Sequence, residues 1–345
     1  MDIRVYDFNF NPLCIMTDII SSAWSLKYNG IGTYEGHFRL SDRISDILLE
    51  NTYMIIVEGQ NQAVCTGKIA DGELLICGRT LNWLLSKRAM PPFKTSEVFG
   101  ESYQKPTAII EYVLKRTFTE PPQIGADGTY SEGTVDEKKK VSGFKIMTMP
   151  ECDVLNRHFW RNSANTAEDI IRDLAELMGK GHKLFFNIKA KTWDFYVLEG
   201  EEKSIILSEI NRNMYDVSYT EEIENYACGG WYEDTTSTES GETAWKYVSF
   251  DDGNTGMMYW DAVLSGAGVS EAQSSLEKKK TEKSVQGTLK KLRYGKDYTL
   301  GDVVEAAVSF GSFERKFKYK IEGINIWNNE SGYGEEPVLV RIKED

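Results

Sequence analysis

The stretch KLRYGKDYTLGDVV, residues 291–304, carries the most characteristic local pattern of the chain. Gly295 and its polar neighbours predict a turn, because glycine adopts turn conformations without steric cost. Tyr298 supplies an aromatic side chain that can anchor this turn, and the Leu-Gly-Asp sequence at 300–302 predicts a bend. The two valines that follow favour an extended strand. The stretch therefore predicts a turn that leads directly into a β-strand.

The chain on both sides of this stretch is rich in predicted strands. From residue 216 onward, apolar or alternating runs typical of strands lie at 216–220, 226–231, 245–250, 303–308, 316–327 and 338–342. Residues 1–95 have the same character, with runs at 3–8, 23–27, 36–40 and 53–58 and a hairpin at 63–79. Short strands at this spacing, separated by Gly, Asn and Asp, favour a small barrel or sandwich.

Helices are expected mainly between these two β-rich parts. Pro106 begins a predicted helix that runs to Phe118, and Asn165 or Thr166 caps a second helix that ends at Gly179. The apolar residues of the second helix recur at helical spacing: Ala167, Ile170, Ile171, Leu174 and Met178. Further segments are predicted as a helical turn at 41–50, a helix at 81–88, a loop or hairpin tip at 125–141, and strands at 183–188, 193–198 and 205–207.

These patterns together predict an α+β chain that is mainly β. Two β units, residues 1–95 and 216–345, flank a mixed α/β domain at 96–215. The second β unit is expected to carry a charged insert at residues 232–285. A helix that feeds a sheet packs its apolar stripe on one sheet face, and this is the arrangement we expect in the middle domain.

The formal net charge of −13 limits the classes of function. It arises from 40 Lys and Arg against 53 Asp and Glu. Wrapping duplex DNA requires clustered basic residues, and so does binding to an anionic membrane surface, so both classes are disfavoured. The first residues show no signal-peptide pattern, and no apolar run reaches the roughly 18 residues of a spanning helix. We therefore expect folding in a cytoplasm and no membrane anchor.

The charge is unevenly distributed in one region. Residues 219–252 contain nine acids against Lys246 alone, and residues 278–296 contain eight bases against Glu282 alone. One interpretation is a solvated, charged excursion of the chain. The other is that segments of opposite sign on neighbouring subunits face each other in a ring, where charge complementarity sets the register more than the affinity.

The five cysteines are scattered and odd in number: Cys14, Cys65, Cys77, Cys152 and Cys228. Asp71 and Gly72 predict a two-residue hairpin loop. This register gives the cross-strand pairs Ala70 with Glu73, Thr66 with Cys77, and Cys65 with Gly78. Because side chains alternate faces along a strand, the Cys65 and Cys77 thiols should point to opposite sides. We expect all five cysteines to be reduced and structural.

Motifs for nucleotide, metal or nucleophile chemistry are absent from the sequence. The glycines at 30–36 lack the spacing of a dinucleotide-binding loop and predict a hairpin turn instead. His37, His158 and His182 do not have metal-site spacing, and without a histidine base no serine or cysteine is a convincing nucleophile. His158 lies among aromatic residues and is expected to be structural. The sequence predicts no catalytic, cofactor-binding or metal-binding residues and no cofactor.

Carboxylate pairs leave a glycosidase open but disfavoured. Such an enzyme needs two carboxyl groups roughly 5–10 Å apart across a sugar cleft. Glu221 and Glu222 are adjacent in sequence, as are Asp251 and Asp252, and adjacent side chains of a strand point to opposite faces. The chain is accordingly predicted not to be an enzyme.

Aromatic residues concentrate in one part of the chain: Trp231, Tyr232, Trp245, Tyr247, Tyr259 and Trp260. They could line a carbohydrate groove. Aromatic side chains also fill β-rich cores and subunit interfaces, which is the interpretation we favour.

The order of several segments resembles the tail hub proteins of tailed phages and prophages. The stretch 291–304 resembles a signature near the end of these proteins. The opening at 3–7, the strand at 34–40, the segment 76–88, the helix at 166–178 and the segment 225–230 occur in the family's order. The resemblance spans nearly the whole chain and is closest to the ReqiPepy-type siphophage tail proteins of Gram-positive prophages.

The resemblance implies a baseplate or tail-tip hub in the virion tail, assembled in the bacterial host cytoplasm. It implies two barrel-like tube domains, a homotrimer that closes the tail tube, and contacts with distal tail, tape-measure and fibre or spike proteins. Phage DNA would pass through without being specifically bound. The alternatives are a cell-wall-degrading glycosidase or peptidase and a carbohydrate-binding adhesin. Residues 232–285 do not align with the family pattern.

Overall fold

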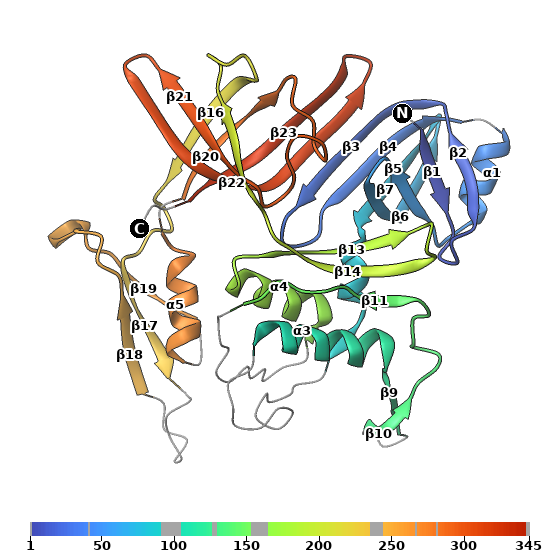
Figure 1. Cartoon of the computed structure of the whole chain (residues 1–345), viewed down its shortest axis with the longest axis horizontal. Coiled ribbons are helices and arrows are strands. Elements are labelled where there is room, and N and C mark those ends of the chain that lie inside the picture. The colour runs from blue at the N-terminus through green and yellow to red at the C-terminus, as the bar shows by residue number, and fades with distance from the viewer. Residues whose placement is uncertain are drawn as a thin grey trace.

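The computed structural model describes residues 2–40, 42–90, 105–125, 130–152, 165–234, 244–265, 268–280 and 282–342. The chain is mainly β and has two barrel-like units, an α/β part and a small inserted unit (Figure 1). The first unit contains α1 (Asp42–Glu50) and the strands β1 (Ile3–Tyr6), β2 (Pro12–Met16), β3 (Ile19–Lys27), β4 (Thr33–Arg39), β5 (Ile55–Glu58), β6 (Asn61–Asp71) and β7 (Glu73–Thr80). The second contains β15 (Glu202–Leu207), β16 (Met214–Glu222), β20 (Glu282–Leu289), β21 (Val303–Phe310), β22 (Phe313–Asn329) and β23 (Gly332–Arg341).

A single 13-stranded sheet runs through both barrel-like units. Its main path is β16-β20-β23-β22-β3-β4-β7-β6-β5-β1-β2, and β15 joins through β21 to β22. The long strand β22 makes the connection, because its first half pairs with β21 and its second half pairs antiparallel with β3. One hydrophobic core follows this sheet, with Trp24 and Ile76 from the first unit and Ile324 and Leu339 from the second. The two units are therefore joined by backbone hydrogen bonds and by a common core.

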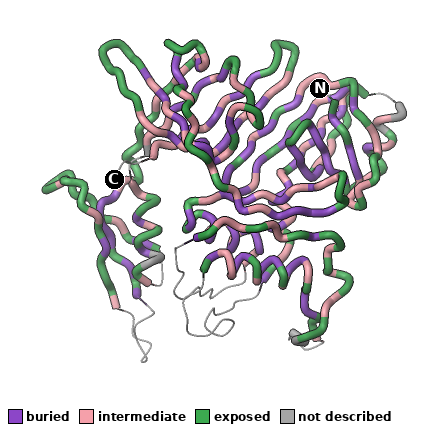
Figure 2. The backbone as a smooth tube through the Cα atoms, viewed as in Figure 1, coloured by how far each residue is buried: buried purple, intermediate pink, exposed green. Residues whose placement is uncertain are grey.

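The strand β5 shows why the α/β part packs against the first unit. Its apolar run does not alternate with polar residues, and all four residues are buried. Ile56 faces the core of the barrel-like unit, whereas Ile55 and Val57 belong to a second core shared with the α/β part. A strand covered on both faces is expected to be apolar throughout. Figure 2 shows buried backbone through this contact region.

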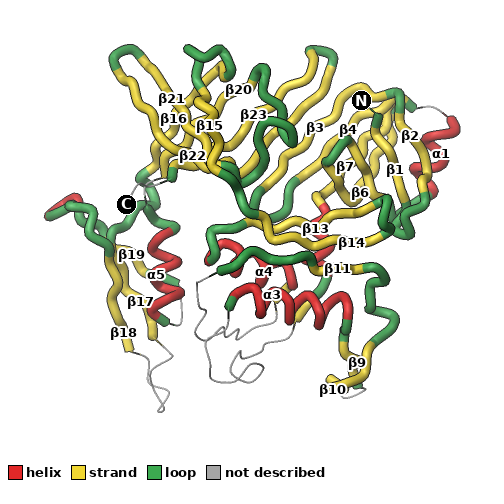
Figure 3. Tube along the Cα trace, in the orientation of Figure 1, coloured by secondary structure: helices red, strands yellow, loops and turns green. Residues whose placement is uncertain are grey.

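In the α/β part, the helix α4 (Ala167–Leu177) packs on the strand β13 (Gly181–Asn187) of a three-stranded sheet, and the helix α3 (Pro106–Leu114) packs on α4 (Figure 3). Its sheet has the order β11-β14-β13. The elements are the 3-10 helix Leu81–Lys87, β8 (Ala89–Met90), α3 (Pro106–Leu114), a π-helical turn Lys115–Thr119, β9 (Pro122–Ile124), β10 (Tyr130–Val135), β11 (Phe144–Ile146), β12 (Asn165–Thr166), α4 (Ala167–Leu177), β13 (Gly181–Asn187) and β14 (Thr192–Leu198). Thr166 caps α4 with a capping box and Gly179 follows its end at a φ of 68°, which confirms both predicted helix boundaries.

The inserted unit projects from the second barrel-like unit between β16 and β20. It consists of β17 (Gly229–Asp234), β18 (Ala244–Ser249), the short 3-10 turn Gly256–Met258, β19 (Asp261–Val263) and α5 (Val269–Glu277). The sheet order is β18-β17-β19, and α5 packs on β17 and β18. A small separate core lies between them, around Tyr232, Val248, Leu264 and Leu276.

Several local predictions differ from the structure. The helix α5 and the following strands were not predicted: β2, β8, β9, β11, β12, β19 and β20. The helix predicted at 81–88 is present as a 3-10 helix over 81–87. The predicted strand at 205–207 is part of β15, which pairs with β21 in the large sheet rather than with the α/β sheet. The domain boundaries at 95 and 215 remain a prediction.

The hairpin of β6 and β7 corrects the predicted register. Asp71, not Ala70, lies opposite Glu73, so Gly72 alone turns the chain, at a φ of 73°. A bulge between Cys65 and Gly67 compensates for this shift, and Cys65 faces Gly78 as predicted. Cys77 lies opposite Gly67 instead of Thr66. Cys65 is buried in the core, Cys77 is half-buried, and all five cysteines are free.

Candidate functional site

The two histidines that the structure describes, His37 and His182, have ordinary structural surroundings. His37 contacts Glu35 and Glu73 on the surface of the first unit, and its pKa is raised by the hydrogen bond with Glu73 and then by that with Glu35. His182 is completely buried, and His158 lies outside the described residues. Among the described residues, no group of three His, Cys, Asp or Glu side chains could hold a metal ion. No helix in the described part of the chain is long and apolar enough to cross a membrane.

The adjacent carboxylates have structural partners. Glu221 lies on β16 and pairs with Lys283 of β20 at 2.8 Å. Asp251 and Asp252 lie in the turn after β18 rather than within a strand, and they accept hydrogen bonds from the backbone N–H groups of Gly253 and Asn254, each at 3.0 Å. These contacts stabilise a strand pair and a turn.

The stretch 291–304 lies where the two barrel-like units and the α/β part meet. Gly301 has a φ of 88°, and a Cβ atom there would lie 2.2 Å from the ring of Tyr28. Gly181 at the start of β13 also contacts Tyr28, and a Cβ there would be 2.2 Å from the Tyr28 carbonyl oxygen. The Tyr28 hydroxyl donates to the carbonyl of Leu198 at 2.8 Å. Tyr28 therefore contacts all three parts, and glycines make room for it on two sides.

Two buried carboxylates hold this stretch in place. Asp302 accepts hydrogen bonds from the backbone N–H groups of Thr299, at 2.8 Å, and Glu201, at 2.9 Å. Glu335 of β23 accepts from the Tyr298 hydroxyl at 2.5 Å and from the Tyr294 backbone N–H at 2.9 Å. Burial and the hydrogen bond to Glu335 raise the pKa of Tyr298, so its hydroxyl stays a donor. Tyr298 is thus the anchor that the sequence predicted, and its buried acceptor is a residue that the sequence did not indicate.

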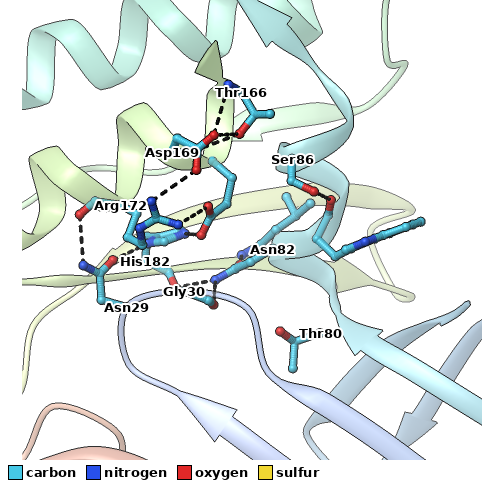
Figure 4. A network of polar contacts seen from close by, with 12 residues as sticks. Asn29, Gly30, Thr80, Asn82, Ser86, Thr166, Asp169, Arg172 and His182 are labelled. Carbon is cyan, nitrogen blue, oxygen red and sulfur yellow. Dashed lines mark hydrogen bonds and ion pairs between the residues drawn. The ribbon is translucent and has the colours of Figure 1, made fainter.

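Side-chain amides attach the α/β part to the first unit. Asn82 donates to the carbonyls of Gly30 and His182, at 2.9 and 3.0 Å, and accepts from the backbone N–H of Leu184 at 2.8 Å (Figure 4). Gln62 forms a similar pair of hydrogen bonds with the backbone of Phe186. Because β13 is an edge strand of its sheet, these two amides satisfy backbone groups that would otherwise be buried without partners.

Next to Asn82 lies a buried ionisable pair. Asn29 donates to the carbonyl of Arg172 at 2.9 Å, and its side-chain oxygen accepts from His182 Nδ1 at 2.8 Å (Figure 4). His182 Nε2 faces Glu168 Oε1 at 3.8 Å, too far for a hydrogen bond. Arg172 Nη1 donates to the other oxygen of Glu168 at 3.0 Å. Burial lowers the pKa of His182 to about 3, and burial raises the pKa of Glu168 although Arg172 opposes this effect.

The acidic and basic segments adjoin each other within one chain at part of their length. β16 pairs antiparallel with β20, which places Glu221 opposite Lys283. Lys278 pairs with Glu176 of α4 at 3.4 Å. Part of the charge contrast is therefore neutralised inside the chain, and the acids at 239 and 242 lie outside the described residues.

The aromatic cluster divides into buried and exposed members. Tyr232 is buried in the small core of the inserted unit. Trp231, Trp245, Tyr247, Tyr259 and Trp260 are each at least 37% exposed. The core interpretation is therefore correct for Tyr232 alone among these residues.

Solved structures with a similar overall fold include prophage tail proteins. The chain is similar to the 43 kDa tail protein of prophage MuSo2 from Shewanella oneidensis, with a TM-score of 0.60 and 10% identity over 99% of this chain and 98% of that chain. It is also similar to the prophage tail protein gp18 from Listeria monocytogenes EGD-e, with a TM-score of 0.56 and 13% identity over 100% and 96%. The tail protein from Neisseria meningitidis MC58 gives a TM-score of 0.55 and 11% identity over 99% and 96%.

At these identities the similarity shows the fold. The chain therefore shares the mainly β fold of these tail proteins over nearly its whole length. No family model matches the sequence, and no curated protein matches it. The predicted membership of the ReqiPepy-type family remains a prediction.

Proposed function

We propose that the chain is a structural, non-enzymatic subunit of a phage or prophage tail, which forms the hub at the tail tip. The observation that supports this most directly is the continuous sheet across two barrel-like units, together with the similarity in fold to prophage tail proteins over the full length. Pairing of β22 with β3 joins the two units by backbone hydrogen bonds, and we propose that together they form one wall segment. Cyclic symmetry would close several such segments into a ring.

The ring would be a homotrimer that closes the tail tube and docks distal tail, tape-measure and fibre or spike proteins. Edge strands support this arrangement, since β2 and β15 each pair with one neighbour only within the described residues. Neighbouring subunits that cover such edges protect them from nonspecific pairing. The net charge of −13 fits a conduit that does not retain DNA, because an acidic wall repels phosphate.

The proposal is tested by the mass and shape of the purified full-length chain. Light scattering should give the mass of a trimer, and electron microscopy should show rings or tail-end particles. A stable monomer that forms no ring and joins no tail would contradict the proposal.

Zymography on Gram-positive cell walls tests the enzyme alternative. We expect no cleared zone. A cleared zone that disappears on a single Asp or Glu substitution would instead establish a cell-wall hydrolase.

A further inference from the structure

The inserted unit exposes one face of its sheet. Along β17, Tyr232 and Asp234 are buried on the side of α5, and Trp231 and Glu233 point to the opposite side, where they are exposed. The register places Tyr247 opposite Trp231 and Trp245 opposite Glu233 on β18. We call this surface the aromatic face, and it comprises Trp231, Glu233, Trp245, Tyr247, Tyr259 and Asp261.

The aromatic face is apolar and acidic at the same time. Trp231 is 48% exposed and Trp245 57%, and Val263 at the edge of the face is 77% exposed. The Tyr247 hydroxyl donates to Asp261 at 2.5 Å and contacts the Tyr259 hydroxyl at 2.9 Å, which fixes the rings beside a carboxylate. Lys246 is the one base within the described strands β17, β18 and β19, and it pairs with Asp234 on the side of α5. The face therefore presents carboxylates among aromatic rings, and the strands β17, β18 and β19 place no Lys or Arg side chain on it.

A surface of opposite charge lies on the same chain. The turn after β20 exposes four bases, which we call the cationic loop: Lys290, Lys291, Arg293 and Lys296. Two of these bases lie over aromatic rings of neighbouring strands. Lys290 Nζ lies 4.3 Å from the ring centre of Tyr215 on β16, and the Arg293 guanidinium lies 4.6 Å from that of Tyr333 on β23. Asp297 accepts from the Arg293 backbone N–H at 2.8 Å and so belongs to the turn itself.

The two surfaces lie at opposite ends of β20. The inserted unit precedes Glu282 and the cationic loop follows Leu289, so the strand separates them by about 23 Å at roughly 3.3 Å per residue. A contact between them thus requires two molecules. Pairing of the acidic face with its own copy about a twofold axis would oppose like charges. A contact between two different patches is head-to-tail, and this is the type of interface from which rings are built.

We propose that the aromatic face of one copy of this chain docks on the cationic loop of the next copy in the assembly. Carboxylates and aromatic rings both attract Lys and Arg side chains, and Arg stacks on aromatic faces. A protein partner fits this surface better than a glycan, because exposed Val263 and the neighbouring Met257 and Met258 offer no hydrogen bonds to sugar hydroxyl groups and methionine and aromatic residues are enriched at protein interfaces. The inference rests on the proposed ring of copies and specifies one of its contacts.

Charge exchange in the full-length chain tests the inference. Sedimentation equilibrium should show that Glu233→Lys weakens self-association by roughly tenfold or more, and that Lys291→Glu with Lys296→Glu does the same. The combination of all three substitutions should restore much of the loss, because the opposite charges face each other again. Trp231→Ala should weaken association as strongly, and association of the wild type should fall as NaCl rises from about 0.05 to about 0.5 M.

Two variants elsewhere on the chain serve as matched controls. Lys138→Glu changes the same charge on an exposed residue of the α/β part, and Tyr53→Ala removes an aromatic ring that is 73% exposed on the first unit. Both should leave self-association unchanged.

Several outcomes would overturn the inference. One is an assembly that survives every variant of the aromatic face, and another is a Glu233→Lys loss that the compensating charges fail to restore. Binding of purified cell-wall polysaccharide that Trp231→Ala abolishes, with self-association unchanged, would assign the face to a glycan. Failure of the proposed function looks different, because the wild-type chain would then remain a monomer and join no tail.

Discussion

Gly301 and Tyr28 show how single residues make the junction of the three parts possible. The left-handed backbone of Gly301 is costly for any residue with a Cβ atom, and the Tyr28 ring occupies the place where that atom would be. The Leu-Gly-Asp sequence predicted a bend, and the bend is present. The identity of the group that fills the space beside it, more than 270 positions earlier in the chain, has no local signal in the sequence.

Gly301→Ala should destabilise the protein by about 3 kcal/mol, the sum of backbone strain and overpacking against Tyr28. Gly311→Ala is a matched control, because Gly311 also has a positive φ, of 63°, but no atom lies within 4 Å of its added Cβ. That control should cost only about 1 kcal/mol. Urea unfolding of both variants measures the difference, and equal losses would show that the Tyr28 contact is unimportant.

His182 predicts a pH dependence of stability. Its pKa is about 3 in the folded chain against 6.5 in the unfolded chain, so between these values the unfolded state binds a proton that the folded state does not. The free energy of unfolding should therefore fall as the pH falls, by about 2 kcal/mol between pH 7 and pH 5. Glu168, whose pKa is raised, acts in the opposite direction, since its folded form takes up a proton more readily.

The contribution of His182 is isolated by His182→Asn, which keeps a donor toward Asn29. Unfolding measured from pH 7 to pH 5 should lose about 2 kcal/mol less in this variant than in the wild type. Parallel pH profiles of the two proteins would contradict a neutral, buried His182.

The helix α4 is the element that sequence analysis described best. Its cap, apolar stripe and terminal glycine are all local signals, and local signals survive folding when the packing agrees with them. The helix α5 was missed because only Ala272 and Leu276 of its residues belong to a core. The strand β20 was missed because only Val285 and Leu289 of its residues belong to a core. The predicted hairpin register is wrong by one residue near the turn, because no sequence pattern indicates the bulge between Cys65 and Gly67.

Thr166→Ala should lower stability by about 1 kcal/mol, because it removes the side chain that accepts from the Asp169 backbone N–H at 3.2 Å. Thr166→Ser keeps the hydroxyl and should be nearly neutral. Denaturant midpoints of the two variants make the comparison. A loss of the same size in the serine variant would mean that the methyl group, not the cap, matters.

At the scale of the whole molecule, the pairing of β3 with β22 organises the fold. These strands are separated by nearly 300 residues, and their apolar patterns identify strands without identifying partners. The exposed aromatic face could not be predicted from the sequence either. The sequence shows that aromatic residues cluster, but it does not show which of them the helix α5 covers. What the sequence provided was the composition of each surface, and the topology determined how those surfaces are placed.

The shared sheet and core predict that stability is distributed unevenly over the molecule. The two barrel-like units share one core and should open together, whereas the inserted unit has a small core of its own and a connection through β16 and β20. Small cores open at lower free energy than the global unfolding. Hydrogen exchange of the full-length chain should therefore find lower protection in β17, β18 and α5 than in β3 and β22. Uniform protection across these elements would contradict this division of stability. If the aromatic face makes a contact in the ring, protection of β18 should increase on assembly.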